Sequence, residues 1–176
     1  GYGSTFTIYL PTSTPHEEDV LITDPFSTEI IRGSGRILYI EDDLDVQAYT
    51  VEMLRELGYE VQYYADVKLA INYIKEHHDD FDLVITDFIL GDHLQGGIEI
   101  LNNVRSIHPH CPVVLLTAYF KHLEKQTEHS HQFSYIVQKP IGFAKLSQIV
   151  NSYLKSENNN MVNFDNNMQK LFDPNY

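Results

Sequence analysis

Four short apolar runs in this chain each end in an isolated polar site, and this pattern limits the folds that are open to it. The runs are Ile37–Ile40, Leu83–Thr86, Val113–Leu116 and Tyr135–Gln138. Short runs of this kind between helical stretches are typical of buried parallel strands. The polar sites that follow them are, in chain order, Glu41-Asp42-Asp43, Asp87, Thr117 and Lys139-Pro140. Because chemistry gathers at the carboxyl ends of parallel strands, we expect these side chains to meet.

Strand and helix patterns alternate from Arg36 onward. We expect strands at 36–41, 59–63, 82–86, 112–116 and 133–138. The first helix is expected at 44–57 with Gly58 as its C-cap. Asp66 is expected to cap the second helix, whose inner face would carry Leu69, Ala70, Tyr73 and Ile74. The remaining helices are expected after Gly97, at 118–128 and from Phe143. This series of five units predicts an α/β fold with a parallel sheet and helices on both faces.

The composition changes at both ends of the alternating region. Residues 12–35 are rich in Ser, Thr, Pro, Gly and acids, which predicts a linker before a globular domain at 36–155. Residues 156–176 are polar and rich in Asn. Two interpretations of that tail stay open, a disordered segment or a docking helix at 161–172.

The charge and cysteine content exclude several classes of function. The net charge of −13 argues against a surface for nucleic acid and against attraction to an anionic membrane. The single cysteine, Cys111, allows no internal disulfide, which fits a reducing compartment. No apolar run reaches the ~18 residues of a membrane span, and no secretory signal is visible. We therefore expect a cytoplasmic location, either as a free protein or as the cytoplasmic part of a membrane-bound one.

The acids at the first and third strand ends predict a cation site. Glu41-Asp42-Asp43 alone is most simply a helix cap, but Asp87 ends a different buried strand. Carboxylates packed into one cleft repel each other and need a compensating cation. A small set of carboxylates with retained water suits Mg²⁺.

Asp87, Thr117 and Lys139 together predict phosphoryl chemistry. An aspartate can act as a nucleophile and form an acyl phosphate. A hydroxyl and an ammonium can both donate hydrogen bonds to phosphoryl oxygens. A cis bond is accessible before Pro140 and would direct Lys139 toward the acids.

Residues 36–155 resemble a response-regulator receiver domain. The resemblance rests on the first strand with its acids, the Leu57-Gly58-Tyr59 turn, Asp87, Thr117-Ala118 and Lys139-Pro140. It implies a flavodoxin-like, doubly wound five-stranded sheet in the order 2-1-3-4-5. It also implies that Asp87 is the phosphoacceptor and that Thr117 and Lys139 assist. By the same resemblance Asp42, Asp87 and the backbone carbonyl of Ile89 bind Mg²⁺, while Glu41 acts mainly through water.

The sequence departs from this family at two places. The loop after Asp87 lacks the usual Leu-Pro and Asp-Gly and is expected to be longer, with Gly96-Gly97 near its end. The switch aromatic of the family stands three residues before the lysine, where this chain has Ile136. Tyr135 is one residue earlier, and a shift of one residue in a strand points a side chain to the opposite face.

The first eleven residues carry a second resemblance. Gly1-Tyr2-Gly3-Ser4-Thr5-Phe6 and the strand-like run to Pro11 look like the closing segment of a histidine-kinase ATP-binding domain. An arbitrary hairpin or an expression scar is the alternative. With the linker and receiver that follow, the resemblance predicts the C-terminal receiver of a hybrid sensor kinase. We expect no kinase activity from this chain, because residues 1–11 cannot form an ATP site.

These patterns predict a receiver of two-component signalling. Asp87 would accept a phosphoryl group from a phosphohistidine, relay it or signal by a conformational shift, and lose it by slow self-catalysed hydrolysis. The expected partners are the phosphohistidine domain of a histidine kinase or a histidine phosphotransfer protein, and we expect a monomer or weak dimer. A receiver-like interaction module that is never phosphorylated stays open. A phosphatase is disfavoured, because Ile89 stands where its second acid would be.

Overall fold

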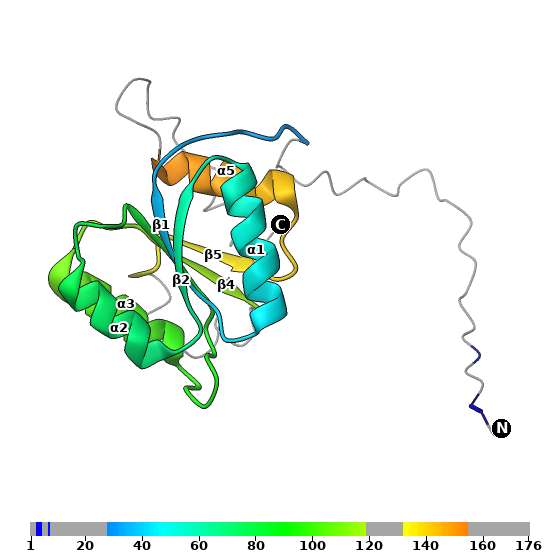
Figure 1. The fold of residues 1–176 in the computed structure, drawn as a ribbon, viewed down its shortest axis with the longest axis horizontal. Helices are drawn as coiled ribbons and strands as arrows, with labels where there is room; N and C mark the ends of the chain where they lie inside the picture. Colours follow the sequence, from blue (N-terminus) through cyan, green and yellow to red (C-terminus); the bar gives the residue numbers. More distant parts are fainter. Residues whose placement is uncertain (1–2, 5–6, 8–27, 119–131, 155–176) are drawn as a thin grey trace, which may run out of the picture.

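A computed structural model describes residues 3–4, 7, 28–118 and 132–154 (Figure 1). In chain order its elements are β1 (Arg36–Ile40), α1 (Leu44–Glu56), β2 (Glu60–Tyr64), α2 (Val67–Glu76), β3 (Leu83–Thr86), α3 (Gly96–Ile107), β4 (Val113–Thr117), β5 (Tyr135–Gln138) and α5 (Phe143–Leu154). The tail at 156–176 lies outside the described residues, and so does the helix expected at 118–128 except for its first residue.

The strands form one sheet in the order β2-β1-β3-β4-β5, and every pairing is parallel. The predicted strand order is confirmed. The chain moves from β1 to β2 on one side and returns to β3 on the other. This reversal opens a crevice outside the carboxyl ends of β1 and β3, which is the usual place for a ligand in an open α/β sheet.

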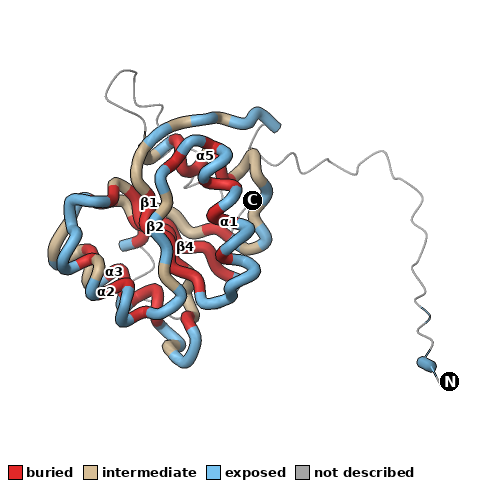
Figure 2. Tube along the Cα trace, viewed as in Figure 1, coloured by how far each residue is buried: buried red, intermediate tan, exposed pale blue. Residues whose placement is uncertain are grey.

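Two apolar cores lie on opposite faces of the sheet (Figures 1 and 2). In β1 the side chains of Leu38 and Ile40 pack toward α2 and α3, whereas those of Ile37 and Tyr39 pack toward α1 and α5. This alternation follows from the two-residue period of a strand. Among the helices of the described residues, none is both long enough and apolar enough to cross a membrane.

The helix ends follow the local sequence, with one correction on α2. Asp66 caps this helix, since its Oδ1 accepts a hydrogen bond from the Leu69 backbone N–H at 2.9 Å. The expected inner position of Leu69 is wrong, because its side chain is 57% exposed. With the cap at Asp66, the buried stripe begins at Val67 and continues through Ala70, Ile71 and Ile74. That is the i, i+3, i+4, i+7 spacing of an amphipathic helix.

The residues just before β1 lie against the domain. We call Glu29–Gly35 the strap. The Ile31 N–H donates to Ser147 Oγ at 3.0 Å, and Gln148 Nε2 donates to the Glu29 carbonyl at 2.8 Å. The Gly33 N–H donates to the carbonyl of Leu57 at 2.9 Å. The strap therefore joins the end of α1 to α5 at the amino-terminal edge of the sheet (Figure 1).

Candidate functional site

Three strands deliver charged side chains to one edge of the sheet. Glu41 and Asp42 follow β1, Asp87 follows β3, and Lys139 follows β5. The strand contacts continue one residue past the strands themselves. The Asp87 N–H donates to the carbonyl of Ile40 at 3.1 Å, and the Lys139 N–H donates to the carbonyl of Thr117 at 2.9 Å. The side chains are thus held on ordered backbone rather than on free loops.

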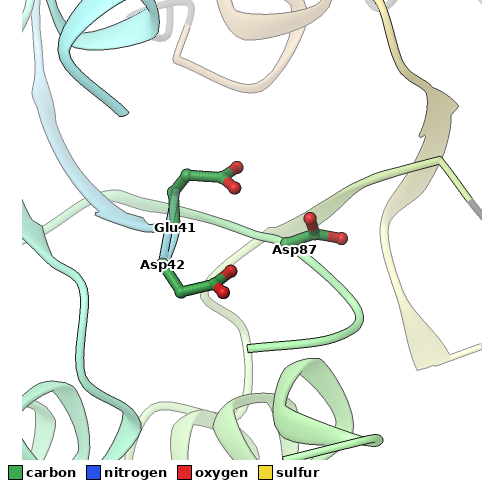
Figure 3. A group of neighbouring side chains, drawn as sticks. All are labelled: Glu41, Asp42 and Asp87. Carbon is green, nitrogen blue, oxygen red and sulfur yellow. The ribbon is translucent and has the colours of Figure 1, made fainter. Parts of the chain in front are cut away.

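The structure brings Glu41, Asp42 and Asp87 together (Figure 3). One carboxylate oxygen of each lies within 4.8 Å of the others. Oxygens around Mg²⁺ in an octahedron lie about 3–4 Å apart, given bonds of about 2.1 Å. The donor set therefore fits a small hard cation after small side-chain movements. Glu41 is buried, Asp87 is half-buried and Asp42 is exposed, so the cluster opens to solvent on one side.

Asp43 does not join the cluster. Its Oδ1 accepts hydrogen bonds from the backbone N–H groups of Asp45 and Val46, at 3.0 and 3.1 Å. Asp43 is therefore the N-cap of α1. Both predicted roles of the acidic triplet at 41–43 therefore occur: Glu41 and Asp42 belong to the acid cluster, and Asp43 caps the helix.

Lys139 links Glu41 and Asp87. Its Nζ lies 2.5 Å from Glu41 Oε2 and 2.6 Å from Asp87 Oδ2. The peptide bond between Lys139 and Pro140 is cis. Three carboxylates and one ammonium leave a negative balance in a partly shielded crevice, and a divalent cation would offset this balance.

The pKa values at this centre follow from burial and charge. Burial lowers the pKa of Lys139, but hydrogen bonds to Asp87 and Glu41 outweigh it, and the pKa is raised overall. The lysine is therefore a stable cation. Burial raises the pKa of Glu41, and the contacts with Lys139 and Tyr39 offset this only in part.

Gly97 explains how close α3 comes to Asp87. A Cβ at this position would collide with the Asp87 carbonyl oxygen and would lie 3.1 Å from Phe88 Cα. The Gly97 N–H instead donates to the carbonyl of Phe88 at 3.0 Å. The loop between Asp87 and Gly97 turns tightly at Gly91, where φ is +57°. This loop lacks the family pattern in sequence, but its glycines still seat the start of α3 on the backbone of Asp87.

Two supports of Glu41 were missed from the sequence. The buried hydroxyl of Tyr39 donates to Glu41 Oε2 at 3.0 Å, and Gln47 Nε2 donates to the Glu41 carbonyl at 2.8 Å. Strand alternation could have found Tyr39, because residues two apart in a strand share a face. Nothing in the pattern of α1 separates Gln47 from an ordinary core-facing residue.

The other expected site residues lie around this centre. Thr117 is the last residue of β4, is fully buried, and pairs in register with Gln138. Ile89 lies in the loop two residues after Asp87. Ile136 packs against the core under α2 and α3, whereas Tyr135 packs against the opposite core. Tyr135 therefore does not stand in for the aromatic that Ile136 replaces.

Comparisons with known proteins show the family of the chain. The family model described as "Response regulator receiver domain" matches residues 37–151. The transcriptional regulatory protein ZraR of Salmonella typhimurium is 28% identical over 127 residues. The alignment covers 71% of this chain and 27% of that protein, so the chain spans about a quarter of this relative's length.

Two solved structures of similar shape contain magnesium. One is the receiver domain of sensor histidine kinase PA1611 from Pseudomonas aeruginosa, with a magnesium ion coordinated in its active-site cleft. It has a TM-score of 0.62 at 25% identity, covering 70% of this chain and all of that one. The other is the response regulator TrrA from Thermotoga maritima in complex with Mg²⁺ and BeF. Its TM-score is 0.60 at 26% identity, covering 68% of this chain and 99% of that one.

Proposed function

The chain belongs to the response regulator receiver domain family of two-component systems, and from this premise we propose that Asp87 is its phosphoacceptor. One observation carries the proposal. The Asp87 carboxylate contacts the Lys139 ammonium at 2.6 Å, with carboxylate oxygens of Glu41 and Asp42 within 4.8 Å of its own. A nucleophile, a fixed cation and two further acids thus share one solvent-open crevice.

The reaction is a phosphoryl transfer from a phosphohistidine. An Asp87 carboxylate oxygen forms a bond to phosphorus while the bond from phosphorus to the histidine nitrogen breaks, and the released imidazole takes up a proton. Asp87 Oδ1 is held by the Phe88 N–H at 2.5 Å and Oδ2 by Lys139, so the carboxylate is oriented before the donor arrives. Lys139 and the Thr117 hydroxyl then donate to the phosphoryl oxygens.

The acids of the crevice form the magnesium site of this proposal. Asp42, Asp87 and the backbone carbonyl of Ile89 would hold the ion, with Glu41 reaching it through water. When bound, Mg²⁺ supplies positive charge that stabilises the charge developing on the transferred group. The chain's own contribution is to fix three carboxylates and one ammonium at this edge of the sheet.

The protein context belongs to the same proposal. We assign the chain to the receiver of a hybrid sensor kinase, on the resemblance of residues 1–11 to the end of a kinase ATP-binding domain. Residues 12–35 would be the linker, 36–155 the receiver and 156–176 the tail. The phosphoryl donor would be a kinase phosphohistidine domain, and the group could pass on to a histidine phosphotransfer protein. Cytoplasmic location and a monomeric or weakly dimeric state stay predictions.

A phosphoryl-transfer assay tests the proposal. The chain is incubated with Mg²⁺ and acetyl phosphate, and its intact mass is measured. We expect one added phosphoryl group, its loss in Asp87→Asn, and its retention in Asp92→Asn. Asp92 is a matched control, because it lies in the same loop outside the acid cluster. No adduct on a folded wild-type chain would contradict the proposal.

One observation favours a second candidate function. Ile136 occupies the position of the family's switch aromatic, and it packs into the core under α2 and α3. A receiver-like chain without that aromatic could serve as an interaction module that is never phosphorylated. The same assay separates the two functions, because the interaction module takes up no phosphoryl group.

A further inference from the structure

Tyr39 is the one fully buried tyrosine of the described residues whose hydroxyl reaches the acid cluster. Its side chain has no exposed surface, and its hydroxyl donates to Glu41 Oε2 at 3.0 Å. The same oxygen accepts the Lys139 ammonium at 2.5 Å. Two donors therefore converge on Oε2, and the Glu41 carboxylate has a defined orientation.

The backbone of Glu41 is held independently of Tyr39. Its N–H donates to the carbonyl of Tyr64 at 3.1 Å, and its carbonyl accepts from Gln47 Nε2 at 2.8 Å. Removal of the Tyr39 hydroxyl would therefore leave the main chain in place. At the acid cluster, the direction of the Glu41 carboxylate and its share of Lys139 would change, and the hydrogen bond between the Tyr39 hydroxyl and Thr50 would be lost as well.

From this geometry we infer that Tyr39 is a positioning residue that acts through Glu41. Its hydroxyl bond takes up part of the charge on Oε2, which limits how strongly Glu41 binds Lys139. Lys139 therefore keeps its hydrogen bond to Asp87. Glu41 Oε1 stays directed toward the place between the three carboxylates where a cation would bind. The inference rests on the proposed function, since the reaction is the one at Asp87.

The physical reason is competition for one oxygen. Without the hydroxyl, Glu41 would be a nearly buried carboxylate with Lys139 as its remaining side-chain donor. Its hydrogen bond with the ammonium would strengthen, because a buried charge with fewer donors depends more on those that remain. Lys139 would then be drawn away from Asp87, and Glu41 would turn with it.

Tyr39→Phe tests the inference, because it removes the hydroxyl and keeps the ring. Tyr63→Phe is the matched control. Tyr63 pairs in register with Tyr39 on β2, but its side chain is 43% exposed. Tyr59→Phe is the control for stability, since that hydroxyl is buried and lies outside the acid cluster.

The first measurement is the initial rate of phosphorylation by acetyl phosphate at saturating Mg²⁺. We expect Tyr39→Phe to slow it about tenfold, the lower end for the loss of one hydrogen bond to a charged group. In a Glu41→Gln background the same substitution should change the rate by less than about twofold, because the charged carboxylate that Tyr39 and Lys139 share is gone. Equal factors in both backgrounds, or no slowing in the wild type, would overturn the inference.

The second measurement does not need phosphorylation. Mg²⁺ should raise the unfolding temperature of the wild type, and this rise should shrink in Tyr39→Phe while persisting in Tyr59→Phe and Tyr63→Phe. If the wild type takes no phosphoryl group but the magnesium response depends on Tyr39, the proposed function fails and the positioning role stands. If all three variants respond to Mg²⁺ like the wild type, the positioning role fails by itself.

Discussion

The ammonium of Lys139 and the carboxylate of Asp87 are 52 residues apart in the chain and lie 2.6 Å from each other. The same ammonium reaches Glu41, which the sequence separates from it by 98 residues. This one cation therefore joins the ends of β1, β3 and β5. Removal of this ammonium should lower both the free energy of unfolding and the rate of phosphorylation.

Lys139→Met should lower the free energy of unfolding by about 3 kcal/mol in the absence of divalent cations, because it leaves buried Glu41 without its ion-pair partner. Mg²⁺ should restore more stability to this variant than to the wild type. Chemical denaturation with and without Mg²⁺ measures both effects. Lys68→Met, on the exposed side of α2, serves as the control and should be nearly neutral. A loss no larger than that of Lys68→Met would contradict the account of this ion pair.

Gly97→Ala should damage the crevice through the backbone. The added methyl group would collide with the Asp87 carbonyl oxygen and so would force Asp87 and α3 apart. We expect a loss of about 1–3 kcal/mol in stability together with slower phosphorylation. Gly142→Ala is the control, because a Cβ there meets nothing within 4 Å. Wild-type phosphorylation in Gly97→Ala would show that this close approach is not needed.

Ser147→Ala should release the strap without unfolding the domain. Ser147 Oγ donates to the Ala144 carbonyl and accepts from the Ile31 N–H of the strap. Ser152 Oγ makes the equivalent bond within the helix, to the Ile149 carbonyl, and serves as the control. Hydrogen exchange of the Ile31 amide should therefore accelerate in Ser147→Ala and not in Ser152→Ala. Equal exchange at Ile31 in the two variants would mean that the strap is held by its other contacts.

The ion pair between Asp82 and Arg36 should make stability depend on pH in the acid range. The side-chain hydrogen bond from Arg36 lowers the pKa of Asp82. A carboxyl group with a lowered folded-state pKa stabilises the fold above its unfolded pKa, and this contribution disappears as pH falls through the folded value.

Asp82→Asn should therefore cost about 0.5–1 kcal/mol at pH 7, a modest value because the carboxylate is 40% exposed. The difference from the wild type should shrink below pH ~4, where the unfolded-state carboxyl begins to protonate. Denaturation at pH 7, 5 and 3 measures it. A difference that stays constant down to pH 3 would contradict the assigned pKa direction.

The strand ends were predictable because two simple rules act on them. A buried parallel strand leaves few places for a charged residue, so Asp87 and Lys139 stand out after their apolar runs. Parallel strands also share one carboxyl edge, which brings such residues together whatever their separation. These rules account for the meeting of Glu41, Asp42, Asp87 and Lys139. The strand order was predicted from the resemblance to the receiver family, not from these rules.

The supports of the site followed from tertiary contacts that the sequence does not display. From the sequence, Gly97 is an ordinary loop glycine, and its role appears only in the close approach of α3 to the Asp87 backbone. Tyr39 likewise looks like an ordinary core aromatic in the sequence, and its hydrogen bond to Glu41 appears only in the structure. The sequence predicts a linker for the strap, because the partners of its backbone hydrogen bonds, Leu57 and Ser147, lie far away in the chain and no local pattern reveals them. The error at Leu69 has a local cause. The buried stripe of α2 starts at Val67, whereas the prediction started it at Leu69, so the predicted inner face was rotated around the helix.

The most direct test of the account is to locate the phosphoryl group chemically. After phosphorylation with acetyl phosphate and Mg²⁺, borohydride reduces an aspartyl phosphate to homoserine, and peptide mass mapping finds the altered residue. The account predicts homoserine at position 87 and unaltered aspartate at 42 and 43. Modification at one of those acids, or a phosphoryl group that resists borohydride on a histidine, would contradict it.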